Sequence, residues 1–476
     1  MVHWHSLPAE IRCMILETLI AHKGTALFAS VSNEWRTFIE QKTFSHIRLH
    51  PECLDHLEQL NNHYRGLIRH LWLNIKLNGY TCRSCRKRES MTLSYSIARI
   101  LREAITRLFS VLTTWRQPLT LELNVYCPSD SQHWFKNSYF GAPGEDKFEC
   151  QEPSDDPIHD PDHGWFEGTI TQAPPDDALR RPFGLSELEF REGLPSVNAV
   201  TKFVLRRQCR QQLNPHIVRY LWSRLPNLEE ISYEPWQSHM NVVQQVSDID
   251  FVRTIQRIPA SVNKVTIFED FNENFLELYA LGRGILSYLN PERVRLPFRV
   301  LGEVFAMRSQ WLEHLSVAFM IDAHDFFDAC QPSWRWPRLK TLALTARGIA
   351  KDSVHQTNEL FQNAAQVALN MPELQTLTIW HGERREACAF TYRRAHGSIC
   401  WQGTRDVGLE VKTLEAWEKV AVTYAGRVLT VDTKLFMEDI KSHGDAVHHL
   451  GLDHVVDRVS LQQIRIENRV SWLTVI

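Results

Sequence analysis

Two cysteines are the first residues of this 476-residue sequence whose type and spacing suggest a specific chemistry. Cys82 and Cys85 are separated by two residues in the basic stretch TCRSCRKR, which is the spacing of one half of a zinc site. A structural zinc ion needs four ligands, but no second pair of this kind follows, and His63 and His70 have no matching spacing. The sequence therefore predicts no metal site and no cofactor.

Carboxylates form the other candidate cluster, at Asp155, Asp156 and Asp160. They lie in a stretch rich in Pro, Asp and Gly, which is typical of a solvated loop rather than of a general acid–base pair. The sequence has no glycine-rich phosphate loop, no Gly-x-Ser-x-Gly motif and no ladder of Cys and His pairs of the RING type. These patterns predict a protein that is not an enzyme.

Composition narrows the class of protein further. The 53 basic and 56 acidic residues give a net charge of -3, which argues against a general binder of nucleic acid or of membrane surfaces. No apolar run approaches the eighteen or so residues of a spanning helix, and Arg12 and Glu17 interrupt the N-terminal run that a signal peptide would need. The ten cysteines are irregularly spaced, so we expect reduced thiols and a cytoplasmic or nuclear location.

The N-terminal stretch from Trp4 to Phe44 predicts three short helices. Ser6 and Pro8 suit the start of the first helix, Gly24 suits its end, and Ser32 can cap the third. Apolar residues recur at helical spacing: Ile11, Met14, Ile15, Leu16 and Leu19, then Leu27, Phe28 and Val31, then Trp35, Phe38 and Ile39. So small a unit cannot bury all of this surface internally. It is either a cap on the following domain or a docking face for a partner.

The same stretch carries a motif that resembles an F-box and covers about a tenth of the chain. The matching residues are Leu7-Pro8-x-Glu10-Ile11-x-x-x-Ile15-Leu16-x-x-Leu19 and Val31-Ser32-x-x-Trp35-Arg36. The continuation Glu34-Trp35-Arg36, Ile39-Glu40 and Thr43-Phe44 is similar to a group of filamentous-fungal F-box proteins of unknown target. Residues 21–26, between the first two helices, lack the acidic-leucine step that is usual in the family.

This resemblance implies binding to the Skp-type adaptor of a Skp–cullin–F-box (SCF) ubiquitin ligase, and through the adaptor to a cullin. The adaptor-binding residues that it implies are Leu7, Pro8, Ile11, Ile15, Leu16, Leu19, Val31 and Trp35.

A recurring apolar-x-x-apolar-x-apolar pattern organises the rest of the chain. Its seven copies begin at Ile68, Val200, Leu228, Val262, Leu312, Leu339 and Leu374. Helical patterns lie between copies, and strand followed by helix is the signature of a leucine-rich-repeat-like solenoid. The uneven spacing makes the array degenerate, and an irregular α/β domain is the alternative.

In a solenoid the residues between the buried strand positions point outward from its concave face. The large ones are expected to contact a target protein, because interface energy concentrates at aromatic and arginine anchors. A one-residue slip of register would turn them inward. They are Trp72, Arg206, Phe268 and Trp380.

These patterns together predict an α/β protein in which a three-helix F-box precedes an irregular leucine-rich-repeat-like strand–helix solenoid. The expected divisions are 1–45 for the F-box-like helices, 46–126 for the first repeat-like units, 127–182 for an acidic loop or disordered insertion, and 183–476 for the target-binding repeats with an end cap.

The function expected from this organisation is substrate recognition for ubiquitin-dependent degradation, by a non-catalytic subunit that binds an adaptor and an unknown target protein. The alternative is an interaction scaffold outside any ligase, whose N-terminal helices only cap the solenoid. Nothing in the residue pattern favours nucleic acid or a membrane as a partner.

Overall fold

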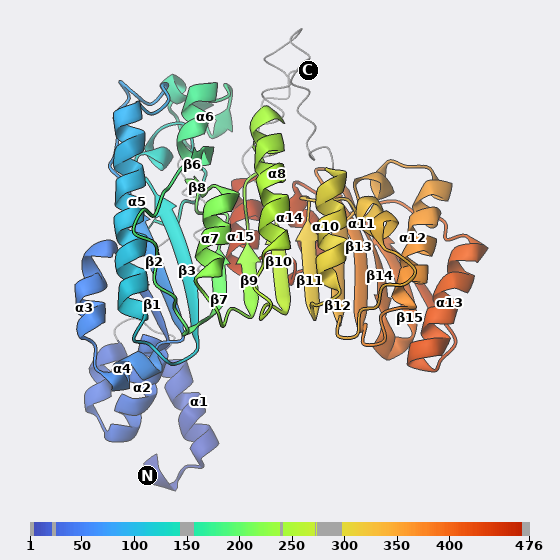
Figure 1. The fold of residues 1–476 in the computed structure, drawn as a ribbon, viewed down its shortest axis with the longest axis horizontal. Coiled ribbons are helices and arrows are strands. Elements are labelled where there is room, and N and C mark those ends of the chain that lie inside the picture. Colours follow the sequence, from blue (N-terminus) through green and yellow to red (C-terminus); the bar gives the residue numbers. More distant parts are fainter. Residues whose placement is uncertain are drawn as a thin grey trace.

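The computed structural model describes residues 4–20, 25–142, 157–238, 241–271, 273 and 298–468. Within them the chain forms one large sheet with helices on both of its faces, so the predicted α/β class is confirmed (Figure 1). The strands of this sheet, in spatial order, are β1 (His46–Leu49), β2 (His70–Lys76), β3 (Leu119–Tyr126), β7 (Val200–Leu205), β9 (Glu230–Tyr233), β10 (Lys264–Phe268), β11 (His314–Ala318), β12 (Thr341–Thr345), β13 (Thr376–Glu383), β14 (Glu386–Arg393), β15 (Ser398–Gly403) and β16 (Thr430–Leu435).

Smaller strand pairs and the helices complete the described structure. The small pairs are β4 (Trp165–Phe166) with β5 (Thr169–Ile170), and β6 (Leu185–Ser186) with β8 (Gln212–Leu213). The α-helices are α1 (Ala9–Ile20), α2 (Asn33–Ser45), α3 (Leu54–Gln59), α4 (Asn62–Leu67), α5 (Met91–Leu112), α6 (Asp176–Phe183), α7 (Pro215–Ser223), α8 (Asn241–Gln256), α10 (Arg299–Ser309), α11 (Ala323–Ala329), α12 (Val354–Ala368), α13 (Val411–Ala425), α14 (His443–His449) and α15 (Arg458–Glu467). Short 3-10 turns include η1 (Trp4–Ser6), η2 (Thr25–Ser30), η4 (Asp130–Gln132) and η5 (Pro161–His163).

The recurring apolar pattern encodes the strands of this sheet and their register. Neighbouring strands from β1 to β13 run parallel, whereas β14 is antiparallel to both β13 and β15. The register aligns the middle residue of each copy with the next, and β3 adds Leu121 to this row. The aligned residues, each at most 1% exposed, are Leu71, Leu121, Phe203, Ile231, Val265, Leu315, Leu342 and Leu377. Parallel strands that bury both faces have this apolar character.

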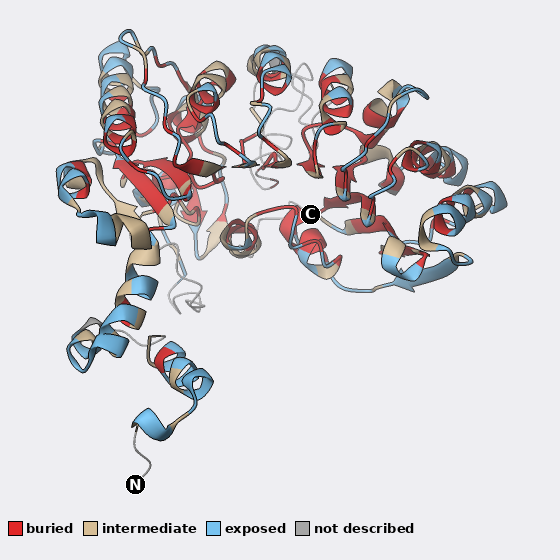
Figure 2. Cartoon of the chain, turned by 60° about the horizontal axis from the view of Figure 1, so that its bottom comes forward, coloured by how far each residue is buried: buried red, intermediate tan, exposed pale blue. Residues whose placement is uncertain are grey.

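The row of aligned residues faces a layer of helices on the convex side of the sheet. Neighbours in this layer pack pairwise, α7 on α8, α8 on α10, and onward through α11 and α12 to α13. Figure 2 shows the buried sheet curving inside this layer, with exposed residues on the outer sides of the helices. The sheet and these helices share one continuous apolar core, because each helix turns its apolar stripe inward.

The C-terminal helices α14 and α15 lie on the concave side of the sheet. Ala446, Val447 and Ile464 from these helices share a second apolar cluster with Phe268 and Trp380 of the strands. Strands β14 to β16 extend the sheet at its end, and the last two helices fill its hollow.

A close approach between α10 and α11 depends on a glycine. A Cβ atom at Gly302 of α10 would lie 2.7 Å from Asp325 Cβ and 3.2 Å from the Asp325 carbonyl carbon, both on α11. Gly66 of α4 is the contrasting case, because a Cβ atom there would have no heavy atom within 4 Å.

We predict that Gly302→Ala lowers the free energy of unfolding by about 1–3 kcal/mol, because an extra methyl group forces two packed helices apart. Gly66→Ala should leave it unchanged or raise it by roughly 0.5–1 kcal/mol, since alanine is the better helix former. Urea unfolding followed by circular dichroism measures both. Equal stability of Gly302→Ala and the wild type would contradict the helix packing described above.

Candidate functional site

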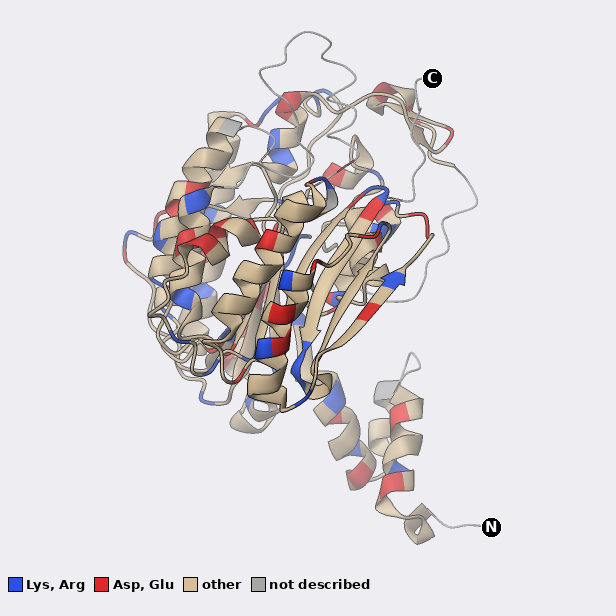
Figure 3. Ribbon diagram, turned by 90° about the vertical axis from the view of Figure 1, so that its right-hand side faces the viewer, with Lys and Arg blue, Asp and Glu red and all other residues tan. Residues whose placement is uncertain are grey.

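The N-terminal unit consists of η1, α1, η2 and α2, and it projects from one end of the sheet (Figures 2 and 3). Ser32 caps α2 by accepting a hydrogen bond from the Trp35 backbone N–H, as predicted. Helix α2 packs on α1 and α4, and it continues directly into β1 at His46. The unit is therefore joined to the sheet without an intervening loop.

Most of the residues that the F-box resemblance selects are accessible on this unit. Pro8, Ile11, Ile15 and Val31 are exposed, Leu7, Leu19 and Trp35 are half-buried, and Leu16 is buried. Neighbouring apolar residues share this exposure, with Met14 60% exposed and Leu27 81% exposed. Apolar side chains left in water at one place mark an interaction surface more often than isolated ones do. Helix α1 thus keeps an apolar face that is not covered by the rest of the described residues.

Trp35 and Leu16 have a different role, because they hold the unit together. The Trp35 ring lies 5.2 Å from the ring of Trp4 and 6.3 Å from that of Phe28. Glu34 accepts hydrogen bonds of 2.9 Å from the Trp4 indole and from Arg12, and these bonds lower the pKa of its carboxyl. A substitution at Trp35 would disturb this packing as well as any docking face.

The four residues predicted to contact a target are all buried in the structure. They lie on the concave side, as the pattern indicated, but the prediction that they are accessible is wrong. Phe268 and Trp380 are packed in the apolar cluster under α14. The Arg206 guanidinium lies 5.0 Å from the ring centroid of Trp72, and its Nε donates a hydrogen bond of 2.7 Å to Glu122. The reason is that α14 and α15, together with buried charges, cover this face.

A buried network of charges joins the concave face to α15. Glu467 at the end of α15 accepts hydrogen bonds from Arg207 Nη2 at 2.5 Å and Arg210 Nη2 at 2.9 Å. Arg207 also donates to Asp270, and all four side chains are at most 2% exposed. Burial would raise the pKa of the Asp270 carboxyl, but the Arg207 guanidinium and His443 together lower it to about 2. Each buried charge in this group therefore has a partner of opposite sign.

His443 at the start of α14 completes this network. Its Nε2 lies 2.8 Å from Asp270 Oδ1 and its Nδ1 lies 3.1 Å from Glu273 Oε1. Burial alone would lower the pKa of this imidazole, but hydrogen bonds to the two carboxylates raise it to about 9. His443 is therefore a buried imidazolium at neutral pH.

A cleft of about 840 Å³ lies beside the start of α5. Its lining includes Ser94 and Tyr95 of α5, Phe183 of α6, Gln211, Trp236, and Val246 of α8. This volume lies in the range of small-molecule and cofactor pockets. Sequence reasoning missed the cleft, because its walls come from segments that are far apart in the chain and have no shared motif.

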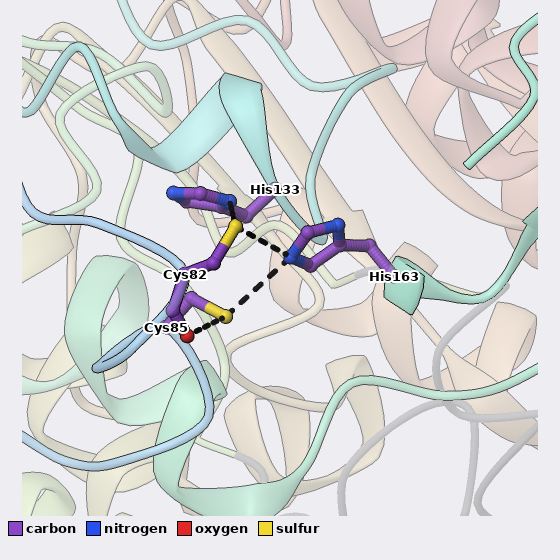
Figure 4. Close-up of side chains that lie close together, drawn as sticks. All are labelled: Cys82, Cys85, His133 and His163. Atoms are coloured by element: carbon purple, nitrogen blue, oxygen red, sulfur yellow. Dashed lines mark hydrogen bonds between the residues drawn. The ribbon is translucent and has the colours of Figure 1, made fainter. Parts of the chain in front are cut away.

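The Cys82 and Cys85 side chains meet two histidines that no spacing rule connected to them (Figure 4). His133 follows η4 and His163 ends η5, and both belong to the segment 127–182 that the sequence predicts to be a loop or insertion. The described parts of that segment pack closely, with Trp134, Phe135 and Trp165 at most 2% exposed. These aromatic residues were the only signal in the sequence that the described parts of the segment are folded.

One further cluster of potential metal ligands lies among the described residues. His381, Glu383 and Glu386 approach one another near the turn between β13 and β14. The Lys351 ammonium lies 2.7 Å from Glu383 Oε1 and already supplies the positive charge there. Among the described helices, none combines the length and the apolar character needed to cross a membrane.

One comparison with known proteins gives a match. Residues 257–457 match the model of a family of unknown function, DUF6546, and no curated protein matches the chain. The matched residues include Asp270, Glu273 and His443 of the buried network. Neither the N-terminal unit nor the Cys82–Cys85 pair falls within them.

We predict that His443 makes the free energy of unfolding fall as the pH rises into the alkaline range. Because its pKa is about 9 in the folded chain against 6.5 ordinarily, its contribution is complete below pH 6.5 and is lost as pH rises through 9. The difference between the wild type and His443→Gln should shrink by about 3 kcal/mol between pH 6 and pH 10. Chemical unfolding at a series of pH values measures this difference.

His355→Gln is the matched control, since His355 is exposed on α12 and its ion pairs are with surface carboxylates. It should show the pH dependence of the wild type. If His443→Gln also kept that pH dependence, His443 would not be charged in the folded protein.

Proposed function

We propose that this protein is a non-catalytic substrate-recognition subunit of a Skp–cullin–F-box ubiquitin ligase. The observation that carries the proposal is the exposed apolar face of the N-terminal unit. Ile11 and Ile15 on α1, and Val31 between η2 and α2, are accessible there, on a unit that projects away from the sheet. An accessible apolar face is what docking on an adaptor requires, because burial of that face supplies most of the binding energy.

The junction between α2 and β1 suits this role. A receptor subunit acts by holding a target near the charged ubiquitin-conjugating enzyme, and its effect depends on the geometry of the link between its two ends. Since α2 continues into β1 and packs on α4, the docking face has a fixed orientation relative to the sheet. For the body, the succession of parallel strands and outer helices supports the proposed leucine-rich-repeat-like solenoid.

The cleft beside α5 is the proposed place for a segment of the target protein. The concave face, where repeat proteins commonly bind, is filled by α14 and α15. The cleft instead offers the exposed Tyr95 and Val246 at its edge and the buried Trp236 within. Aromatic residues at the centre of a recess are where binding energy concentrates.

The interaction scaffold stays as the second candidate function. Helix α2 packs against α4 and runs directly into the edge strand β1, so the N-terminal unit also lies at the end of the strand array. An end cap has this contact, and residues 21–26 lack the usual acidic-leucine step of an F-box. Adaptor binding separates the two functions.

We predict that the full chain binds a purified Skp-type adaptor and that the double change Ile11→Asp and Ile15→Asp weakens binding more than tenfold. The two residues are one helical turn apart, so both lie on one face of α1. Buried carboxylates there would remain unpaired and desolvated in the complex. Biolayer interferometry with immobilised adaptor measures the affinity.

Val411→Asp and Val422→Asp together form the matched control, because both valines are exposed on α13 at the other end of the sheet. This variant should bind the adaptor as the wild type does. If the folded wild type did not bind the adaptor, the ligase proposal would be contradicted and the interaction scaffold would become the leading function.

A further inference from the structure

Four potential metal ligands from three separate segments converge beside the cleft (Figure 4). Cys82 Sγ lies 3.4 Å from His133 Nδ1 and 3.7 Å from His163 Nε2, and Cys85 Sγ lies 3.5 Å from His163 Nε2. All four ligand atoms lie within 4.8 Å of one another. In a tetrahedral zinc site, bond lengths of about 2.3 Å to sulfur and 2.0 Å to nitrogen place these atoms about 3.5 Å apart. The observed separations leave room for one ion of this size.

We propose that Cys82, Cys85, His133 and His163 bind one Zn²⁺ ion in a closed, structural Cys₂His₂ site. Two thiolates and two imidazoles form a ligand set that suits zinc rather than calcium or magnesium, which prefer oxygen. With four protein ligands, no position stays open for water or substrate, so the ion stabilises the fold and performs no catalysis. Each thiol loses its proton when the ion binds.

The surroundings of His163 favour metal binding over a simple hydrogen-bonded cluster. Its Nδ1 lies 2.7 Å from Asp160 Oδ2, which also pairs with Lys136 Nζ at 3.0 Å. A carboxylate on the far nitrogen fixes the tautomer and turns the lone pair of Nε2 toward the two sulfur atoms. Such a carboxylate–histidine arrangement is the usual support of a zinc ligand.

Burial distinguishes this site from cysteines and histidines that meet by chance at a surface. Cys85, His133 and His163 are at most 6% exposed, whereas Cys82 is exposed and gives the ion a path of entry. The cysteines are unbridged in the structure, so both sulfur atoms are available. Metal coordination would give all four ligand atoms, three of them on buried residues, a common partner.

The ion would join the loop TCRSCRKR to the segment 127–182. The same junction is crossed by Arg86, which donates to Asp162 O at 2.8 Å, and by Arg181, which donates to Ser84 O and Lys87 O. The loop continues into Arg88 and Glu89, which line the cleft. Zinc binding would therefore fix one wall of the cleft, whichever function the cleft serves.

Metal analysis of the full chain, purified under reducing conditions with zinc in the medium, tests the proposal. We expect about one zinc ion per chain in the wild type and in the control Cys13→Ser/Cys53→Ser, and less than about a fifth of that in Cys82→Ser/Cys85→Ser. A wild type that is folded, has free thiols and holds no zinc would overturn the proposal. So would full zinc content in Cys82→Ser/Cys85→Ser.

Cobalt substitution provides a readout that needs no variant. Replacing the ion with Co²⁺ should give the visible bands of a tetrahedral site and a thiolate-to-cobalt charge-transfer band. His133→Gln should change the visible bands, and a six-coordinate spectrum in the wild type would exclude the proposed site.

Chelation should also expose the loop to trypsin after Arg83, Arg86, Lys87 and Arg88, while zinc restores protection. Cleavage that is equal with and without zinc would contradict the structural role of the ion.

Discussion

The pairing of Glu467 with Arg207 and Arg210 is the interaction on which the concave half of the structure depends. Glu467 joins α15 to residues about 260 positions earlier in the chain, and its carboxylate is nearly inaccessible to water. Removing one partner from such a group typically costs about 3–5 kcal/mol, because the remaining charge stays buried without compensation. The buried arginines in the turn after β7 and the buried carboxylate at the end of α15 are each unfavourable without the other. Helix α15 is therefore a required part of the sheet's concave face rather than an appendage.

This constraint decides which surfaces are open to other molecules. A curved parallel sheet with helices outside usually offers its hollow to partners, but here Phe268 and Trp380 lie beneath α14 in an apolar cluster. The accessible features lie at the N-terminal end instead, where α1 presents apolar residues to solvent and the cleft opens beside α5. Both belong to the part of the chain that precedes residue 257, where the match to the family of unknown function begins.

Local patterns predicted the elements well, whereas contacts between distant segments could not be predicted. The spacing of Leu342 and Leu344 specifies a buried strand by itself, and the repetition of that spacing aligns eight strands in register. Ser32 signals a helix start through its own side chain. By contrast, the residue type of Arg206 suggests an exposed interface residue. The guanidinium can be buried because the fold brings Glu122, which is distant in the sequence, within hydrogen-bond distance of it. His133 and His163 are separated from the cysteines by long stretches, so no ligand spacing revealed them.

The buried charges and the cysteine–histidine cluster both hold residues of the segment 127–182 in place. Glu467 accepts a hydrogen bond from the Tyr139 backbone N–H at 2.8 Å, and its own carbonyl accepts one from Asn137 at 2.9 Å. His133 lies a few residues before this contact and belongs to the proposed zinc site. The segment is thus held at one point by α15 and at another by the cluster, and its aromatic side chains fill the space between. The described parts of this stretch, whose composition resembles a loop, are folded because distant residues supply the charges and ligands that fix them.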